Sequence, residues 1–254
     1  MSSIAKTQPS AFELALEQSP PSEKPPVQEQ HLAPEDCLAP GRFVDSETPE
    51  VVDFARRSAG DTSDAIEKAR RLYLAVRDGL RYNPFIVTSD PATFTASHAL
   101  QCGFGFCVTK AALLAAVARA EGIPARLGFA DVRNHLTTPK LRRMMGTDVF
   151  AYHGYTELWL DSRWVKATPA FNASLCARAR IRPLEFDGRN DSIYHPFDLD
   201  GRRHMEYLRY RGIYVDIPFE AMMRCFAELY GPIIDEHGST HPEEDASDFF
   251  AATR

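Results

Sequence analysis

The stretch that decides the fold is residues 103–122, GFGFCVTKAALLAAVARAEG, with Pro124 two positions beyond it. From Cys107 onward, almost every position is apolar or small. A helix that is apolar on all sides belongs in the interior of a domain, and Gly122 followed by Pro124 is a strong helix stop. The sequence therefore predicts a buried helix that begins near Cys107.

Candidate β-strands follow this helix. They cover residues 125–132, 152–160 and 164–168, and the short segment between the last two suits a hairpin turn. Amphipathic helices flank the set, one with N-cap candidates at residues 61–63 and one that starts near Pro218. Helices first and an antiparallel sheet afterwards predict an α+β domain in which the buried helix packs against the sheet.

The two ends of the chain differ in composition from its middle. Residues 1–50 hold eight of the eighteen prolines and carry nine acidic and three basic side chains, and residues 235–254 carry six acidic and one basic. Such polar segments cannot bury enough apolar surface to order themselves. We therefore expect a disordered tail at 1–35, one domain at 36–236 and an acidic polar tail at 237–254.

The net charge of −6 belongs to those ends. Residues 51–234 hold 25 basic and 20 acidic side chains, so the domain itself is mildly basic. The acidic total argues against a nucleic-acid partner. The basic domain, in contrast, favours an anionic ligand such as a carboxylate-bearing peptide or metabolite.

The sequence shows neither a candidate membrane-spanning segment nor a candidate secretion signal. No run of 18 apolar residues occurs, and the first 18 residues lack the basic start, apolar run and cleavage site of a signal peptide. The five cysteines are an odd number without CxxC spacing, which is typical of reduced thiols. We expect a cytoplasmic protein with no membrane partner, no cofactor and no metal.

Cys107 is the first candidate for chemistry. It lies at the predicted helix start, where free N–H groups and the positive end of the helix dipole stabilise a thiolate. Gly103 and Gly105 allow a tight turn and close approach of a substrate, the same N–H groups would hold a developing oxyanion, and Lys110 would add positive charge. Most free cysteines are core residues, and that role is assigned to Cys102, Cys176 and Cys225.

His153 is the second candidate. It opens the strand predicted at 152–160, whose alternation turns His153 to the same face as Glu157, and Gly154 leaves room beside the imidazole. A histidine there would take the thiol proton from Cys107 and return it to a leaving amine. A hydrogen-bonded structural histidine is the alternative, because the two residues must also meet in space.

Together these motifs resemble the transglutaminase-like superfamily, in its bacterial-type form, which has a papain-like cysteine-protease fold. The resemblance covers roughly residues 70–172: Gly-Phe-Cys opening the buried helix, Gly-Ile-Pro-Ala-Arg at 122–126, and the His153 strand followed by a hairpin and Trp-Val at 164–165. It implies Cys107 as nucleophile and His153 as base. In that superfamily the third catalytic residue is an aspartate just before a proline, after the Trp-Val strand.

The third position departs from that pattern. Thr168, before Pro169, stands where the aspartate is expected. A threonine hydroxyl accepts a hydrogen bond from imidazole and fixes its tautomer, but it cannot compensate imidazolium charge. Thr168 ranks first by position and Asn172 second by chemistry, ahead of Asp187 and Asp191.

Three other features of the sequence give weaker indications of function. His195 and His204 have no recognised metal-ligand spacing, so we assign them surface or packing roles. Residues 134–149 form a long segment before the His153 strand, either a lid or a solvated insertion. Arginines after the hairpin suit carboxylate or phosphate recognition, although several will pair with acidic side chains. They are Arg178, Arg180, Arg182, Arg189, Arg202, Arg203, Arg209 and Arg211.

These residues predict a thiol enzyme that transfers an acyl group from an amide or ester through a thioester on Cys107. Water as acceptor would make it a peptidase or amidase, and an amine would make it a transglutaminase-type enzyme. The sequence leaves both open. The alternative, favoured by Thr168, is a catalytically impaired domain that binds a peptide or small acid in the cleft where active relatives bind their substrate.

Overall fold

The computed structural model describes residues 32–194 and 196–231. Its helices are α2 (Pro49–Ala59), α3 (Ala65–Gly79), α4 (Ala96–Cys102), α5 (Cys107–Ala120), α6 (Pro139–Met145), α7 (Ala173–Ala179) and α8 (Phe219–Tyr230). Its strands are β1 (Arg81–Tyr82), β2 (Phe104–Gly105), β3 (Ala125–Asn134), β4 (Val149–Leu160), β5 (Arg163–Ala167) and β6 (Met205–Tyr214). The tail expected at 237–254 lies outside the described residues, as does that at 1–35 except for its last few residues.

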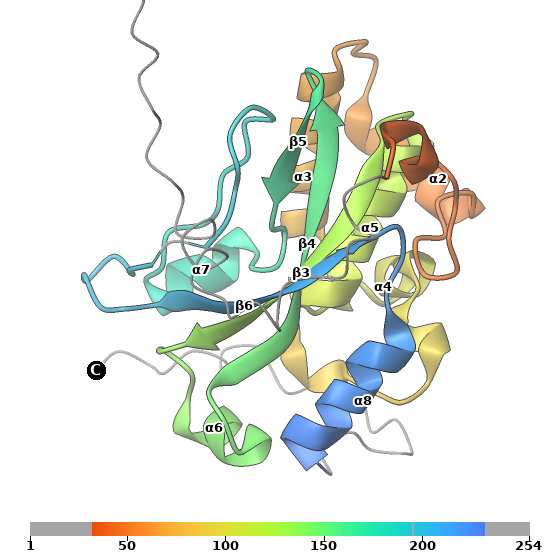
Figure 1. The fold of residues 1–254 in the computed structure, drawn as a ribbon. Coiled ribbons are helices and arrows are strands. Elements are labelled where there is room, and N and C mark those ends of the chain that lie inside the picture. Colours follow the sequence, from red (N-terminus) through yellow and green to blue (C-terminus); the bar gives the residue numbers. More distant parts are fainter. Residues whose placement is uncertain (1–31, 195, 232–254) are drawn as a thin grey trace, which may run out of the picture.

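A four-stranded antiparallel sheet forms the centre of the molecule, in the order β5-β4-β3-β6 (Figure 1). β1 and β2 form a separate parallel pair next to the start of α5. A two-residue turn joins β4 to β5, and its Asp161 and Ser162 have φ angles of 47° and 61°. This left-handed geometry matches the twist of a hairpin. The α+β class and the hairpin expected from the sequence are confirmed.

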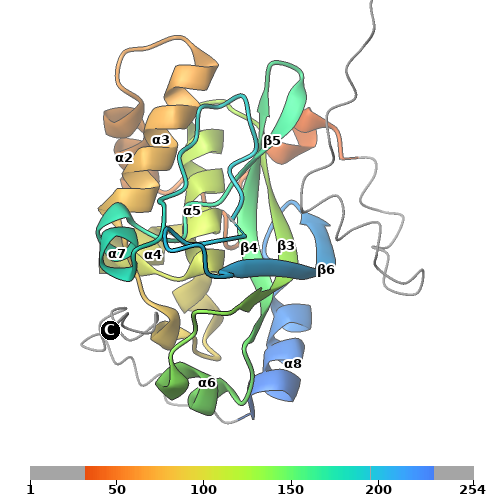
Figure 2. The ribbon, with the colours of Figure 1, turned by 90° about the vertical axis from the view of Figure 1, so that its left-hand side faces the viewer.

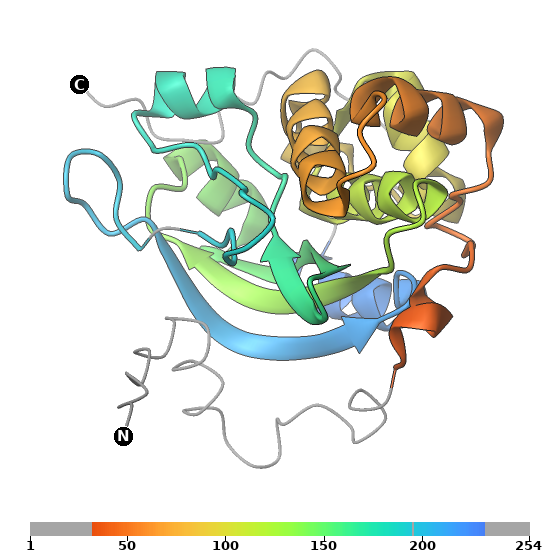
Figure 3. The same ribbon diagram turned by 90° about the horizontal axis from the view of Figure 1, so that it is seen from above.

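Helix α5 fills the space between the sheet and the other helices. Every side chain from Val108 to Arg119 is buried. The helix packs on β3 and β4 and also contacts α2, α3 and α4 (Figure 2). Figure 3 shows the sheet curving beneath this helical layer. A helix that is apolar on nearly all sides needs such an enclosure, so the expectation of a buried helix on an antiparallel sheet is confirmed.

The start of α5 is fixed by its own first turn. Phe106 is extended, with φ −107° and ψ −175°, and Thr109 Oγ1 accepts a hydrogen bond from its N–H at 3.1 Å. A Cβ at position 105 would lie 2.7 Å from that same hydroxyl, so the turn depends on Gly105. Cys107 is therefore the first helical residue.

Several elements lie outside the set expected from the sequence. They are α2 at the start of the domain, α4 and the short strands β1 and β2 before α5, α7 after the hairpin and β6 within the arginine-rich segment. The segment 134–149 contains α6, which contacts α8. The first expected helix begins at Ala65, because Asp64 caps it by accepting from the Ile66 N–H at 3.0 Å. In the described part of the chain, no helix has the length and apolar character needed to cross a bilayer.

Candidate active site

Backbone N–H groups near the Cys107 sulfur favour its thiolate. Those of Gly154 on β4, of Val108 and of Cys107 itself each lower the pKa of the thiol. Burial is the larger influence and raises that pKa to about 11. The thiol is therefore protonated in the resting structure. The helix-start amides lower the pKa as expected, but enclosure by the protein has the larger effect on it.

Gly154 lets β4 approach the first turn of α5. β5 pairs with β4 only as far as Thr156, so the Gly154 peptide lies beyond the paired stretch. A Cβ at position 154 would lie 3.0 Å from Val108 Cα and 3.3 Å from the Cys107 carbonyl oxygen. Both are backbone atoms that cannot rotate away. Glycine at this position is therefore what allows β4 to reach the sulfur.

His153 precedes Gly154 on β4, so its side chain starts one residue from the peptide that meets the Cys107 sulfur. The residue is 6% exposed and its ring stacks on Tyr194, with centroids 4.7 Å apart. Neither ring nitrogen has a hydrogen-bond partner among the described residues. Burial lowers the pKa of His153 to about 3, so the imidazole is neutral.

Tyr194 contacts His153 and lies within electrostatic range of Cys107. Its ring stacks on His153. The pKa of its phenol is raised well above the ordinary value, mainly by burial and in part by the charge that Cys107 would carry. The structure thus places Cys107 and His153 on adjoining segments, the start of α5 and the strand β4, without a hydrogen bond between them.

Thr168 follows the last residue of β5 and is 2% exposed. Its N–H donates to Ser192 O at 3.1 Å, and its carbonyl accepts from Tyr73 OH at 3.1 Å. Continuing the β4–β5 register by one pair places it opposite Tyr155, on the face of β4 that carries His153. Its hydroxyl has no hydrogen-bond partner in the described part of the chain.

Asn172, the second candidate for the third position, has both ends of its amide engaged. Its Oδ1 accepts from the Tyr82 N–H at 3.1 Å, and its Nδ2 donates to Ser174 Oγ at 2.7 Å. These bonds join β1 to the start of α7. The Asn172 side chain therefore holds the wall of the site together in this structure and does not hydrogen-bond to His153.

The two aspartates of the following loop are also engaged elsewhere. Asp187 accepts from the N–H groups of residues 189 and 190 and from the Asn190 side chain. Asp191 accepts from the Lys166 N–H at 2.9 Å and from its ammonium group at 3.2 Å. Neither side chain is hydrogen-bonded to His153.

Lys110 is directed away from the thiol. It is fully buried, and its Nζ donates to Arg77 O at 2.8 Å and to Leu80 O at 2.7 Å, at the end of α3. Burial lowers its pKa to about 7. Lys110 thus fastens α5 to α3, which corrects the expectation that it supplies positive charge to Cys107.

A small hollow, open to solvent, adjoins the aromatic wall of the site. Phe171 and Tyr194 form one side, with ring centroids 5.1 Å apart. Phe197 lines it and is 56% exposed. Arg182 also lines it, is exposed, and has no ion-pair partner among the residues described. The remaining lining residues are Cys176, Ile181, Leu184 and His204. Sequence reasoning did not place this hollow; its only signal was the arginine-rich composition.

The histidines considered as metal ligands do not form a site. His195 lies outside the described residues. His204 is buried, with its ring centroid 6.2 Å from that of Tyr194 and 6.5 Å from that of Phe171. Across residues 32–194 and 196–231, no group of three or more His, Cys, Asp or Glu side chains is arranged to hold a metal ion.

The fold and the site define a class of protein: an α+β domain with a cysteine at the start of a buried helix and a histidine on the adjoining strand. The family model of the transglutaminase-like superfamily matches residues 52–169. These residues form a transglutaminase-like superfamily domain, as their motifs indicated. The match includes Cys107, His153 and Thr168, and the superfamily supports a cysteine-dependent enzyme as the broad class.

Two solved structures are similar to the chain. One is a candidate cysteine protease from Cytophaga hutchinsonii, with 17% identity, a TM-score of 0.47, and coverage of 78% of this chain and 52% of that one. The other is a candidate protease from Parabacteroides distasonis, with 18% identity, a TM-score of 0.33, and coverage of 54% and 27%. The chain therefore spans 52% and 27% of their lengths. No curated protein matches the chain.

Proposed function

We propose that this protein transfers the acyl group of a peptide amide, or a related amide or ester, with Cys107 as nucleophile and His153 as base. The observation that carries this proposal is the close approach of Gly154 on β4 to the first turn of α5, where a Cβ at position 154 would lie 3.0 Å from Val108 Cα and 3.3 Å from the Cys107 carbonyl oxygen. His153 is the residue before Gly154, so a histidine and a cysteine are carried by the two segments that meet here, β4 and the start of α5. A nucleophile and a base in this relation are the requirement for thiol catalysis.

In the first step the Cys107 sulfur bonds to the carbonyl carbon while His153 accepts the thiol proton. The N–H groups at the start of α5 stabilise the oxyanion. The C–N bond then breaks as His153 returns the proton to the departing amine, which leaves a thioester on Cys107. Water or an amine, losing its proton to His153, attacks the thioester and the sulfur leaves as the restored thiol.

Both groups are neutral in the resting site, which has a consequence for the first step. A thiol with a pKa of about 11 and an imidazole with a pKa of about 3 do not exchange a proton before substrate binds. Polar groups of the bound substrate must reduce the difference between the pKa of the thiol and that of the imidazole. The proton then moves as the sulfur attacks. The proposal is therefore general-base catalysis by His153.

Thr168 is proposed as the residue that orients the imidazole. Its hydroxyl is buried without a described partner, on the face of β4 that carries His153. An imidazole N–H donating to Oγ1 would fix the tautomer in which the other nitrogen can accept the thiol proton. Asn172 would serve only if its amide left Tyr82 and Ser174.

The proposed substrate carries an apolar group close to a carboxylate. Phe171 and Phe197 offer apolar contact in the hollow, and Arg182 offers a guanidinium for a bidentate carboxylate contact. A peptide that ends in an apolar residue has this chemistry. All five cysteines are free, which agrees with a reducing compartment such as the cytoplasm.

A second candidate function is a binding module that has lost catalysis. Thr168 at the aspartate position favours it, because a hydroxyl does not compensate the charge of an imidazolium. The hollow and its unpaired arginine would serve this function equally well. The two candidates differ in whether a thioester forms on Cys107.

Turnover of peptides separates the candidates. Peptides ending in apolar residues, each as free acid and as amide, are incubated with the protein in the presence and absence of an alkylamine. We expect cleavage or amide exchange that falls on the order of 10³-fold or more in Cys107→Ser and in His153→Gln. Amide exchange, as opposed to cleavage alone, would identify an amine as the acceptor.

Cys102→Ser is the matched control, because Cys102 Sγ lies 3.4 Å from His98 Nε2 on α4, a second thiol–imidazole pair away from any helix start. This variant should keep full turnover. Turnover that survives in Cys107→Ser would overturn the assignment of the nucleophile. Tight binding of the peptides without turnover by the unaltered protein would favour the binding module.

A further inference from the structure

The strand that carries His153 is interrupted immediately before it. Ala130 of β3 pairs with His153, but Val132 pairs with Phe150, so one residue of β3 faces two residues of β4. Tyr152, the residue next to His153, has a φ of 52° and is buried. A bulky residue in the left-handed region is strained and persists only where its surroundings hold it. β4 therefore contains a β-bulge directly before the proposed base.

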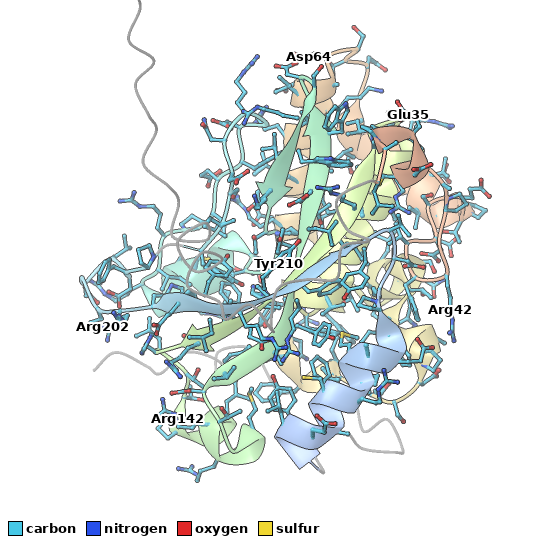
Figure 4. The ribbon with its side chains drawn as sticks, viewed as in Figure 1. Glu35, Arg42, Asp64, Arg142, Arg202 and Tyr210 are labelled. Atoms are coloured by element: carbon cyan, nitrogen blue, oxygen red, sulfur yellow. The ribbon has the colours of Figure 1, made fainter. Side chains whose placement is uncertain are left out.

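A second bulge lies across the sheet, on β6. Phe129 of β3 pairs with Gly212 and Ala130 pairs with Tyr210, so Arg211 is an extra residue. Figure 4 shows Tyr210 near the point where β6 crosses β3. Both bulges thus lie at the same level of the central strand β3, one on either side of it.

One buried carboxylate joins the two bulges. Asp131, on β3 between them, accepts from the Tyr152 N–H at 3.1 Å through Oδ1. Both of its oxygens also accept from Arg211, at 2.9 and 3.0 Å from Nε and at 2.7 Å from Nη2. The Arg211 guanidinium lies 5.0 Å from the centre of the Tyr152 ring. Asp131 is 6% exposed, so its charge depends on this pairing.

The bulge decides which way His153 faces. Side chains alternate along a strand, so one extra residue reverses the face of every residue beyond it relative to those before it. Without Tyr152 in its left-handed conformation, His153 would turn away from Tyr194, or β4 would shift against α5. β-bulges are used at active sites to re-aim side chains in this manner.

We infer that Asp131 and Arg211 are positioning residues: they hold the bulge at Tyr152 and so keep the His153 imidazole in its place beside Cys107. The inference rests on the proposed function in taking His153 as the base. Asp131 and Arg211 touch neither the thiol nor the substrate in this account. Their effect is transmitted through the backbone of residues 152–154.

The test uses Asp131→Asn and Arg211→Met, with Arg126→Met as matched control. Arg126 pairs with Glu157 at 2.7 Å and lies 4.0 Å from the centre of the Trp164 ring. The two ion pairs are equally buried. The side chains of Arg126 and Glu157 are 14% and 6% exposed, and those of Arg211 and Asp131 are 16% and 9% exposed. The Arg126 pair joins β3 to β4 where the register is regular. Arg211→Met is included because Asp131→Asn alone could fail to fold.

The first readout is independent of activity. The Cε1–H NMR signal of His153, assigned by its loss in His153→Ala, is compared in the folded variants. We expect it to move in Asp131→Asn and Arg211→Met and to stay in place in Arg126→Met. Arg211→Lys, which keeps the charge but not the bidentate contact, should shift it less than Arg211→Met. An unmoved signal in both Asp131→Asn and Arg211→Met would overturn the inference.

The second readout is the rate constant for alkylation of Cys107 by iodoacetamide. We expect Asp131→Asn and His153→Ala each to lower it, on the order of 10-fold or more, and the double variant to be no slower than His153→Ala alone. Multiplying effects would mean that Asp131 acts independently of His153, against the inference. If His153→Ala leaves the rate unchanged while the NMR signal moves, positioning stands and the proposed catalytic function fails.

Discussion

The two halves of β4 differ in how completely their polar groups are satisfied. In the second half the register with β3 and β5 is regular, Glu157 pairs with Arg126, and Thr156 Oγ1 donates to Ala111 O at 2.8 Å. In the first half, Tyr152 is left-handed and both nitrogens of His153 lack a described partner. The same strand is thus conventional at one end and irregular at the other.

The difference separates stability from function along one element. Buried polar groups are normally hydrogen-bonded, and an exception calls for an explanation. Where β4 is satisfied, it holds the sheet to α5. Where it is not, it carries the proposed base, His153, whose ring nitrogens have no described partner. Sites that break local rules are expected to be the functional ones.

Breaking the satisfied half should give the largest loss of stability. Arg126→Met leaves the Glu157 carboxylate buried, with only Lys166 Nζ at 4.0 Å to compensate it. We expect the free energy of unfolding to fall by about 3 kcal/mol, measured by urea denaturation. Because the site is remote, turnover by the folded protein should be unchanged. A fall in turnover without a fall in stability would contradict the division between the two halves.

At the junction of the halves, Gly154→Ala should affect both properties. The added methyl group would meet Val108 Cα at 3.0 Å, which forces β4 away from α5. The expected cost is about 2 kcal/mol, together with slower alkylation of Cys107, because β4, which carries His153, moves away from the first turn of α5. Gly79→Ala is the control, since its Cβ would meet only Phe54 Cζ, at 4.0 Å. Equal effects of the two variants would refute the proposed contact.

The irregular half should make stability depend on pH. The pKa of His153 is about 3 in the folded protein against an ordinary value of 6.5. Between pH 3 and pH 6.5, His153 is protonated in the unfolded chain but not in the folded protein. Stability therefore falls as pH drops below 6.5, by roughly 1.4 kcal/mol per pH unit from this residue. His153→Gln should show a shallower fall between pH 6.5 and 4.5; parallel curves would show that His153 is not buried as a neutral base.

The smallest effects should come from two buried threonines at neighbouring positions of the hairpin. Thr156→Val removes a hydroxyl that donates to Ala111 O, and should cost about 1 kcal/mol. Thr168→Val removes a hydroxyl with no described partner, and should leave the free energy of unfolding within about 0.5 kcal/mol. Turnover, in contrast, should fall more in Thr168→Val than in Thr156→Val. A larger stability loss for Thr168→Val would mean that its hydroxyl serves the fold.

Much of the fold could be predicted because its signals are local. The apolar surface of residues 107–120, the Gly-Pro stop and the turn before Arg163 each act within a few residues. β6 was not predicted, because the extra residue Arg211 and a further register shift near Leu208 interrupt its alternation. The short helix α2 follows a proline-rich segment, and Thr48-Pro49-Glu50 was its only start signal.

The site was predictable in its residue types but not in its electrostatics. Cys107 and His153 could be named from motifs, and the structure places them on adjoining segments, the start of α5 and the strand β4. Their pKa shifts arise from burial by distant segments such as that of Tyr194, which no local pattern reports. The role inferred for Asp131 depends on contacts across three strands; the available signal was an acidic residue within a strand that is otherwise largely apolar.

The central claim is that Cys107 and His153 work as a neutral nucleophile–base pair. The most direct measurement is the rate constant for alkylation of Cys107 by iodoacetamide between pH 6 and 10, in the unaltered protein and in His153→Ala. The account predicts slow labelling at pH 6, a rate that rises with pH, and a loss on the order of 100-fold at pH 7.5 when His153 is removed. Rapid labelling already complete at pH 6, or equal rates in the two proteins, would contradict it.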